Sequence, residues 1–154
     1  MLKKTNNVHY IIRLMRRISF LFFILFSCVF TAHADSRPDC LMCGMYLEQY
    51  SHVRYEVVTK DNKVHATCGV QCGLFLQLNL KDTFKSATAT DLFSHKTLPA
   101  SKAWYVYKSS VITDMGPGFI AFASRKQAEN FITGFGGKLF TYQEALDLAK
   151  TGLK

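Results

Sequence analysis

The sequence predicts an α+β fold made of duplicated ββαβ units, in which two small mixed sheets each carry a helix. Segments rich in β-branched and aromatic residues occur in closely spaced pairs in each half. Each pair precedes a stretch whose apolar residues have helical spacing. Residues 35–95 are expected to form the first unit and residues 96–154 the second, after an N-terminal signal helix within residues 1–34. The repeat is one of element order, because side-chain identity between the halves is weak.

The N-terminus has the three-part pattern of a secretory signal. Five Lys and Arg residues and no acidic residue come first, an apolar run fills residues 18–30, and an A-x-A pattern ends at Ala34. The run is shorter than the ~20 residues that a helix needs to cross a bilayer. We therefore expect an exported, periplasmic protein, with a retained membrane anchor or lipidation at Cys28 as the alternatives.

Charge and motif content argue against two classes of function. The net charge is +8, but 14 basic residues stand against 11 acidic ones once the five cations of the signal are removed. So mild a balance does not indicate a nucleic-acid-binding surface. The chain shows no Ser/His/Asp set, no paired carboxylates and no phosphate loop, so the sequence indicates a protein that is not an enzyme.

In the first unit, residues 53–59 alternate in polarity and are β-branched, which predicts a strand. Turn-forming residues at 60–63 lead into a second strand at 64–67, closing a hairpin. Residues 69–80 carry many apolar side chains and are expected to form a mostly buried helix. A third strand is expected at residues 86–92.

The second unit follows a link expected near residues 95–101. Ser124 and Gln127 have the spacing of a capping box, which predicts that a helix begins there and runs to about Thr133. Its other elements are a strand, a tight loop, a return strand, a closing strand and a terminal helix, expected at residues 103–108, 115–118, 119–123, 138–141 and 143–150.

Sulfur side chains form the motif with the clearest chemistry. Cys40 and Cys43 have C-x-x-C spacing with Met45 beside them, and Gly44 allows the tight turn that lets Cys43 and Met45 face one point. Thiolate and thioether sulfur are the ligands that Cu(I) prefers. A neutral thioether among thiolates gives a site that holds the ion and can also release it. This combination indicates a Cu(I) site.

Three further residues are candidate ligands. Cys68 ends the second expected strand and Cys72 lies four residues later in the first turn of the helix, so the two thiols can share a face. The helix N-terminus favours their thiolate forms. Met115 lies in a glycine-rich loop where a ligand could approach closely.

Three alternatives remain open on spacing alone. Four cysteines suit a structural Zn(Cys)₄ site, and an even number of cysteines in an exported chain permits two disulfides. A thiol–disulfide oxidoreductase is a third possibility, although no βαβ context follows Cys40.

The stretch from Cys40 to Met45 resembles the C-x-x-C-G-M signature of the NosL family, accessory copper chaperones for nitrous oxide reductase. Cys68 is similar to the third cysteine of several members. The resemblance continues in order and spacing through the second half and covers roughly residues 39–146. Its further positions are Ala103-Trp104-Tyr105-Val106, Met115-Gly116, Ala121-Phe122-Ala123, Ala128 and Gly136-Gly137-Lys138.

The resemblance implies a duplicated ββαβ fold and a periplasmic Cu(I) carrier, often lipid-anchored. Its partner would be a copper-receiving enzyme of denitrification, or the membrane machinery that assembles it. The family's sulfur-rich site maps onto Cys43, Met45 and Met115. Cys72 is an additional thiol relative to that pattern, so the ligand set of this chain is expected to differ.

Overall fold

The computed structural model describes Met15, residues 38–113 and residues 116–152. Chain contacts divide the protein into residues 1–36 and 37–154, and all named elements lie within residues 37–154. Apart from Met15, the expected signal helix lies outside the described residues, as does Cys28. Within the described part, no helix is both long and apolar enough to span a bilayer.

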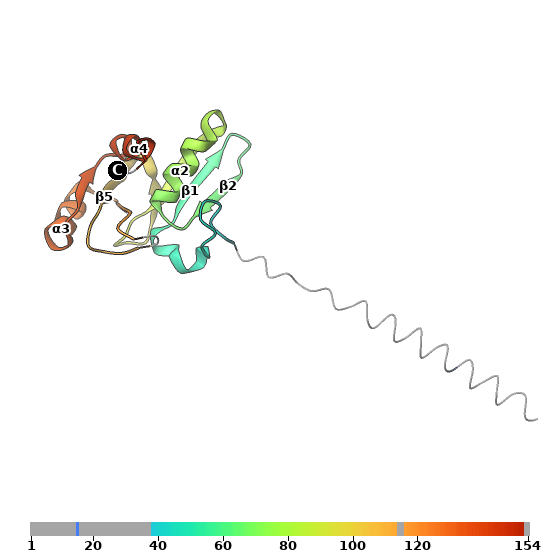
Figure 1. The fold of residues 1–154 in the computed structure, drawn as a ribbon, viewed down its shortest axis with the longest axis horizontal. Helices are drawn as coiled ribbons and strands as arrows, with labels where there is room; N and C mark the ends of the chain where they lie inside the picture. The colour runs from blue at the N-terminus through green and yellow to red at the C-terminus, as the bar shows by residue number, and fades with distance from the viewer. Residues whose placement is uncertain (1–14, 16–37, 114–115, 153–154) are drawn as a thin grey trace, which may run out of the picture. The chain divides into compact units, whose positions relative to one another are not determined.

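Two sheets and their helices confirm the predicted α+β class (Figure 1). The first sheet has the order β2-β1-β3-β4 and the second has the order β6-β5-β7. Figure 1 shows α2 beside β1 and β2, and α3 and α4 beside β5. The strands are β1 Tyr55–Thr59, β2 Val64–Thr67, β3 Phe84–Thr90, β4 Thr97–Pro99, β5 Trp104–Tyr107, β6 Phe119–Phe122 and β7 Lys138–Phe140. The helices are α2 Val70–Leu80, α3 Arg125–Phe135 and α4 Tyr142–Lys150.

The prediction of mixed sheets was wrong, because every strand pair in both sheets is antiparallel. In the first unit, β2 and β3 are joined across α2 and run in the same direction, as a helical crossover requires. They are not neighbours, however, because β1 lies between them. In the second unit β5 lies between β6 and β7 in the same way.

Each unit joins its second strand to its helix by two residues. Cys68 and Gly69 connect β2 to α2, and Ala123 and Ser124 connect β6 to α3. The two units therefore repeat the same path from strand into helix.

Three local differences from the predicted elements have simple causes. The strand expected from residue 53 begins at Tyr55, because residues 47–53 form the 3-10 helix η1. The third strand is shifted to Phe84–Thr90. The expected link contains β4 and the 3-10 helix η3 (Ala100–Lys102), since residues 97–99 pair with the end of β3. A three-residue strand is too short to show alternation.

The start of α3 also differs from its prediction. The Ser124 hydroxyl accepts a hydrogen bond from the Gln127 backbone N–H, but the Gln127 side chain contacts that hydroxyl rather than the Ser124 backbone. The reciprocal capping box occurs at α4, where Thr141 and Glu144 satisfy each other's backbone N–H groups. Both first turns thus gain a side-chain cap.

The largest hydrophobic core contains side chains from both units. Tyr55 of β1 and Tyr105 of β5 are fully buried in it. Tyr55 donates a hydrogen bond to Gln77 of α2 at 3.0 Å, and Gln77 donates to the Tyr142 hydroxyl of α4 at 2.6 Å. A chain of polar contacts therefore links the helices of the two units through an otherwise apolar interior.

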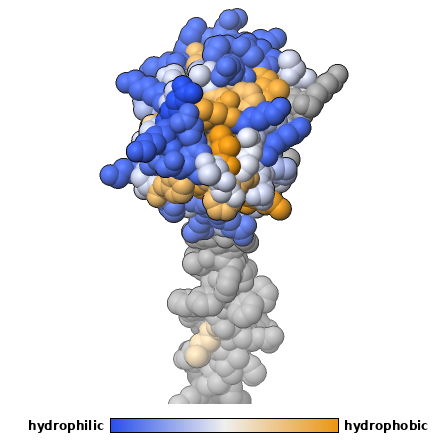
Figure 2. Space-filling model, turned by 90° about the vertical axis from the view of Figure 1, so that its left-hand side faces the viewer, coloured by the Kyte–Doolittle hydropathy of each residue, from blue (hydrophilic) through white to orange (hydrophobic). Residues whose placement is uncertain are grey.

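The surface of the second unit also shows apolar side chains. Figure 2 shows an apolar strip on this face, flanked on two sides by hydrophilic side chains. Phe93 and Phe135 are among the large exposed apolar residues of the described chain. Both contact the buried Phe131, with ring centroids 6.5 Å and 4.8 Å from its own. These rings extend outward a second, smaller core formed by Val106, Ile120, Phe122, Ala128 and Phe131.

Candidate metal centre

A tight turn presents both thiols of the C-x-x-C motif. The Cys40 N–H donates to the Met45 carbonyl at 2.8 Å, and the Gly44 N–H donates to the Cys40 carbonyl at 2.8 Å. Asp39 and Tyr46 form a β-bridge at the base of the turn. Gly44 has a φ of 74°, a left-handed conformation that glycine adopts without strain. The turn is therefore closed by its own backbone.

The second thiol pair lies where β2 meets α2. Cys68 follows the last residue of β2, and Cys72 lies in the first turn of α2. The Thr67 hydroxyl lies 2.9 Å from the Tyr55 carbonyl and 3.0 Å from the Gly69 carbonyl. These contacts hold the connection against β1 and fix the direction in which α2 leaves the sheet.

The two thiol pairs converge on one point. The sulfur of Cys43 lies 3.4 Å from that of Cys68, which lies 3.6 Å from that of Cys72. These separations exceed the ~2.05 Å of an S–S bond, so the side chains are thiols rather than disulfides. All four sulfur atoms lie within 4.8 Å of one another, and we call this group the thiol cluster: Cys40, Cys43, Cys68 and Cys72.

Burial within the thiol cluster is uneven. Cys40, Cys68 and Cys72 are at most 4% exposed, whereas Cys43 reaches the surface. Leu47 is buried against the cluster, and Met45 packs beside it together with Tyr50 and Ala66. The shell is thus mainly apolar, and it leaves one side of the cluster open.

The thiols differ in how readily they ionise. Burial acts to raise the pKa of Cys40, but N–H groups of Cys68, Met42 and Cys43 and the Cys43 thiol outweigh it, so the pKa of Cys40 is lowered. Burial, followed by the charge of Cys40, raises the pKa of Cys72, so the expectation that the helix N-terminus favours its thiolate form was wrong. Negative charge is therefore easier to place at Cys40 than at Cys72, and Cys72 keeps its proton until a cation compensates it.

The structure places five of the six sequence-predicted ligands at this site. Met45 is partly buried and packs against the cluster, while Met115 lies outside the described residues. Among the described residues, the four cysteines are the only group of three or more Cys, His, Asp or Glu side chains arranged to hold a metal ion. The 3-10 helix η1, which carries Leu47 and Tyr50 against the cluster, was not predicted from the sequence. The three-residue spacing of these two side chains is typical of one face of a helix.

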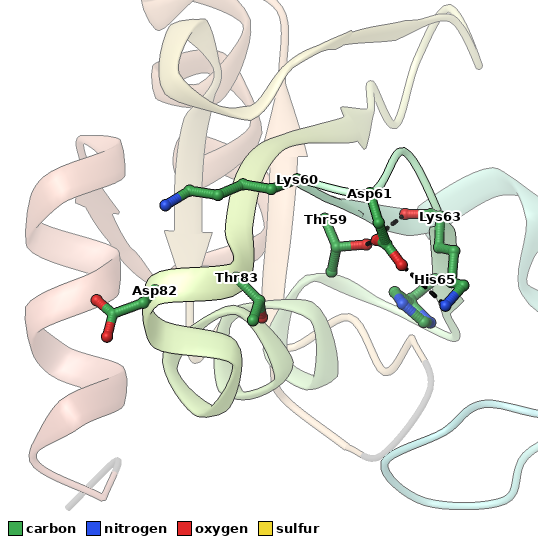
Figure 3. A pocket seen from close by; sticks show the side chains of 7 residues that line it. All are labelled: Thr59, Lys60, Asp61, Lys63, His65, Asp82 and Thr83. Carbon is green, nitrogen blue, oxygen red and sulfur yellow. Dashed lines mark hydrogen bonds and ion pairs between the residues drawn. The ribbon is translucent and has the colours of Figure 1, made fainter.

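A surface pocket of about 460 Å³ lies at the other end of the β1–β2 hairpin. The Asp61 carboxylate accepts a hydrogen bond from the Thr59 hydroxyl and pairs with Lys63 at 2.8 Å. Figure 3 shows these contacts. The hydrogen bond from Lys63 is the main reason that the pKa of Asp61 is lowered. His65 lines this pocket (Figure 3). Its full lining is Thr59, Lys60, Asp61, Lys63, His65, Asp82 and Thr83.

Comparison with known proteins gives the chain a family. The NosL family model matches residues 31–147, a span that includes the turn, both ββαβ units and all four thiols. This chain belongs to the NosL family. The sequence resemblance is thereby confirmed.

A solved NosL structure has the same fold. The crystal structure of the copper chaperone NosL from Shewanella denitrificans is 30% identical in sequence and superposes with a TM-score of 0.60. The match covers 71% of this chain and 90% of that one, so nearly the whole of that NosL chain has a counterpart here. A search of curated proteins found no match.

Proposed function

We propose that this NosL-family protein is a non-enzymatic copper chaperone that carries Cu(I) in the thiol cluster. The observation that carries the proposal is the convergence of four cysteine sulfur atoms within 4.8 Å. Its support is the similarity to a solved copper chaperone over most of the chain. Thiolates are soft ligands that match a soft monovalent cation.

The cluster holds the ion through thiolates, so loading displaces protons. The lowered pKa of Cys40 favours its thiolate form. Met45 packs beside the cluster and offers a neutral thioether. By the family resemblance, Met115 would be a further ligand.

We propose that the ion is delivered after export, in the periplasm. The recipient would be nitrous oxide reductase, a related copper enzyme, or the membrane machinery that assembles such an enzyme. Support for this step comes from the signal-like N-terminus and from family membership.

A structural zinc site is the second candidate. A tetrahedral Zn²⁺ with Zn–S bonds of ~2.3 Å separates its sulfur ligands by about 3.8 Å. The two measured distances, 3.4 Å and 3.6 Å, are close to that value. The geometry is therefore compatible with zinc, which is the competitor that an experiment must exclude.

The test is metal competition on protein purified after export without oxygen. Titration with Cu(I) against a chromophoric Cu(I) chelator should show about one tightly held ion, and excess Zn²⁺ should not displace it. Displacement by Zn²⁺, or failure to compete with the chelator, would contradict a copper-carrying role.

Three substitutions identify the ligands. Cys43→Ser and Cys68→Ser should each lower Cu(I) affinity at least ten-fold, since each removes a thiolate from the cluster. Met42→Leu is the matched control, because Met42 lies in the same turn but is not among the side chains packed against the cluster. Equal affinity in all three variants would exclude this site.

A further inference from the structure

The thiol cluster has one accessible member. Cys68 is 0% exposed, Cys40 3% and Cys72 4%, so a second molecule cannot reach their sulfur atoms. Cys43 lies at the surface, within 3.4 Å of the Cys68 sulfur. An incoming ligand can therefore meet a metal held by the cluster from the Cys43 side.

The turn that carries Cys43 sets the character of this open side. Leu41 and Met42, the two residues before Cys43, are 64% and 36% exposed. The turn is closed at its base by the hydrogen bonds of Cys40, Gly44 and Met45, so these side chains project from a fixed backbone. The open side of the cluster, at Cys43, is thus bordered by apolar surface.

We propose that Cys43 is the exchange ligand of the cluster, through which Cu(I) enters and leaves, while Cys68 and Cys72 form the retaining end. Because Cu(I) prefers soft sulfur ligands, the proposed acceptor is a molecule bearing a cysteine thiol. This inference rests on the proposed function, because it concerns the path of the ion in that site.

The exchange step conserves charge and oxidation state. The acceptor sulfur forms a bond to Cu(I) as its thiol loses a proton, and the bond from Cu(I) to Cys43 breaks. The Cys43 thiolate takes up the released proton. Copper stays monovalent throughout, so no oxidant or reductant is needed. Such a step is associative, so its rate rises with acceptor concentration.

Rapid-mixing measurements test the proposal. Protein purified after export and loaded with Cu(I) is mixed without oxygen with increasing excess of a short synthetic peptide that contains two cysteines. For the unsubstituted protein, we expect the transfer rate to rise in proportion to peptide concentration. A rate that does not depend on peptide concentration would overturn the proposal.

Two single substitutions separate exchange from affinity. In Cys43→Ser, the slope of rate against peptide concentration should fall at least ten-fold. Cys72→Ser is the matched control, because it removes a thiol from the buried end: Cu(I) affinity should fall while the slope is kept. Retention of the slope in Cys43→Ser and its loss in Cys72→Ser would reverse the assignment.

Alkylation provides a test that needs no variant. With limiting iodoacetamide and no metal, mass spectrometry should find the label first on Cys43. Label on a buried thiol before Cys43 would contradict the proposal. If the unsubstituted protein retains no Cu(I) at all, the proposed function itself fails, and this result is distinct from a failure of the exchange assignment.

Discussion

The absence of a side chain at Gly73 allows α2 to approach the first sheet closely. A Cβ placed at this position would lie 2.1 Å from the Tyr55 ring, far inside van der Waals contact. Tyr55 cannot move aside easily, because it is fully buried and hydrogen bonded to Gln77. The glycine therefore allows the close packing that places the first turn of α2, with Cys72, against β1.

We expect Gly73→Ala to lower the free energy of unfolding by about 1–3 kcal/mol through overpacking. The measurement is urea denaturation followed by circular dichroism. Gly134→Ala in α3 is the matched control, because the added methyl group would meet no atom within 4 Å beyond its chain neighbours and the backbone of its own helix. The control should leave stability unchanged or raise it by up to about 1 kcal/mol. Equal effects at the two positions would refute this reading of Gly73.

The cysteine pKa values make metal binding depend on pH. Burial raises the pKa of Cys72, so this thiol is protonated at neutral pH and must lose its proton on loading. Cu(I) affinity should therefore increase as pH rises from 6 to 8, measured by competition with a chelator at each pH. Cys72→Ser should show a shallower dependence. A Cu(I) affinity that falls as the pH rises would contradict this prediction.

At the scale of elements, Asp91 joins the end of β3 to the second sheet. Its carboxylate accepts from the Ala123 N–H at 2.8 Å and from the Ser94 N–H at 2.8 Å, and the neighbouring Leu92 N–H donates to the Ala121 carbonyl. Asp91 is 1% exposed. The carboxylate thus adds to the backbone hydrogen bond of Leu92 in connecting the end of β3 to the second sheet.

Burial acts to raise the pKa of Asp91, but donors from Ser94, Ala123 and Phe93 outweigh it, and the pKa is lowered in the folded state. A carboxyl group with a lowered folded pKa adds stability above its unfolded pKa of ~3.9, and that stability is lost as pH falls through the folded value. Unfolding measured between pH 7 and pH 2 should show this loss.

Asp91→Asn should reduce stability by roughly 1.5–3 kcal/mol at pH 7, since hydrogen bonds to a charged group are replaced by neutral ones. It should also flatten the acid dependence. Asp61→Asn is the control: its partner Lys63 is highly exposed, so little change is expected. Equal losses in the two variants would show that Asp91 does not join the sheets in this way.

Local pattern sufficed for the elements that alternate or have helical spacing over several residues, such as β1 and α3. It did not reveal β4, because three residues carry no period, and β4 forms through pairing with the distant end of β3. Antiparallel order was missed because a crossover helix suggests parallel neighbours, and only the tertiary position of β1 separates β2 from β3.

The cysteines of the candidate site were predictable from the sequence, but their geometry was not. The motif and the family resemblance identified the thiols. That Cys40 and Cys68, 28 positions apart, belong to one cluster depends on how the turn packs against the start of α2, which spacing cannot give. The uneven burial of the four thiols, and hence the difference between Cys43 and Cys72, has no counterpart in the sequence pattern.

At the scale of the whole described domain, the thiol cluster and the main core are separate. The main core joins side chains of both units, whereas the cluster packs with Leu47, Met45, Tyr50 and Ala66. The fold therefore has a source of stability that does not depend on metal, unlike a small zinc-nucleated domain.

We accordingly expect the metal-free protein to stay folded and to unfold cooperatively, as followed by circular dichroism during heating under reducing conditions. Adding Cu(I) should raise the unfolding temperature, since a ligand that binds only the folded state stabilises it. The control is Cys43→Ser, whose unfolding temperature should respond less to Cu(I). Unfolding on removal of metal would instead indicate a structural zinc site.

The two-residue junction between strand and helix appears once in each unit, at Cys68–Gly69 and again at Ala123–Ser124. Counted from these junctions, Ala123 stands where the first unit has Cys68, and Gln127 stands where it has Cys72. The same strand-to-helix junction therefore occurs in both units, but only the first unit has cysteines at these two positions. The duplicated half is a ready template for engineering an additional soft-metal pair, with Ala123→Cys and Gln127→Cys as the starting design.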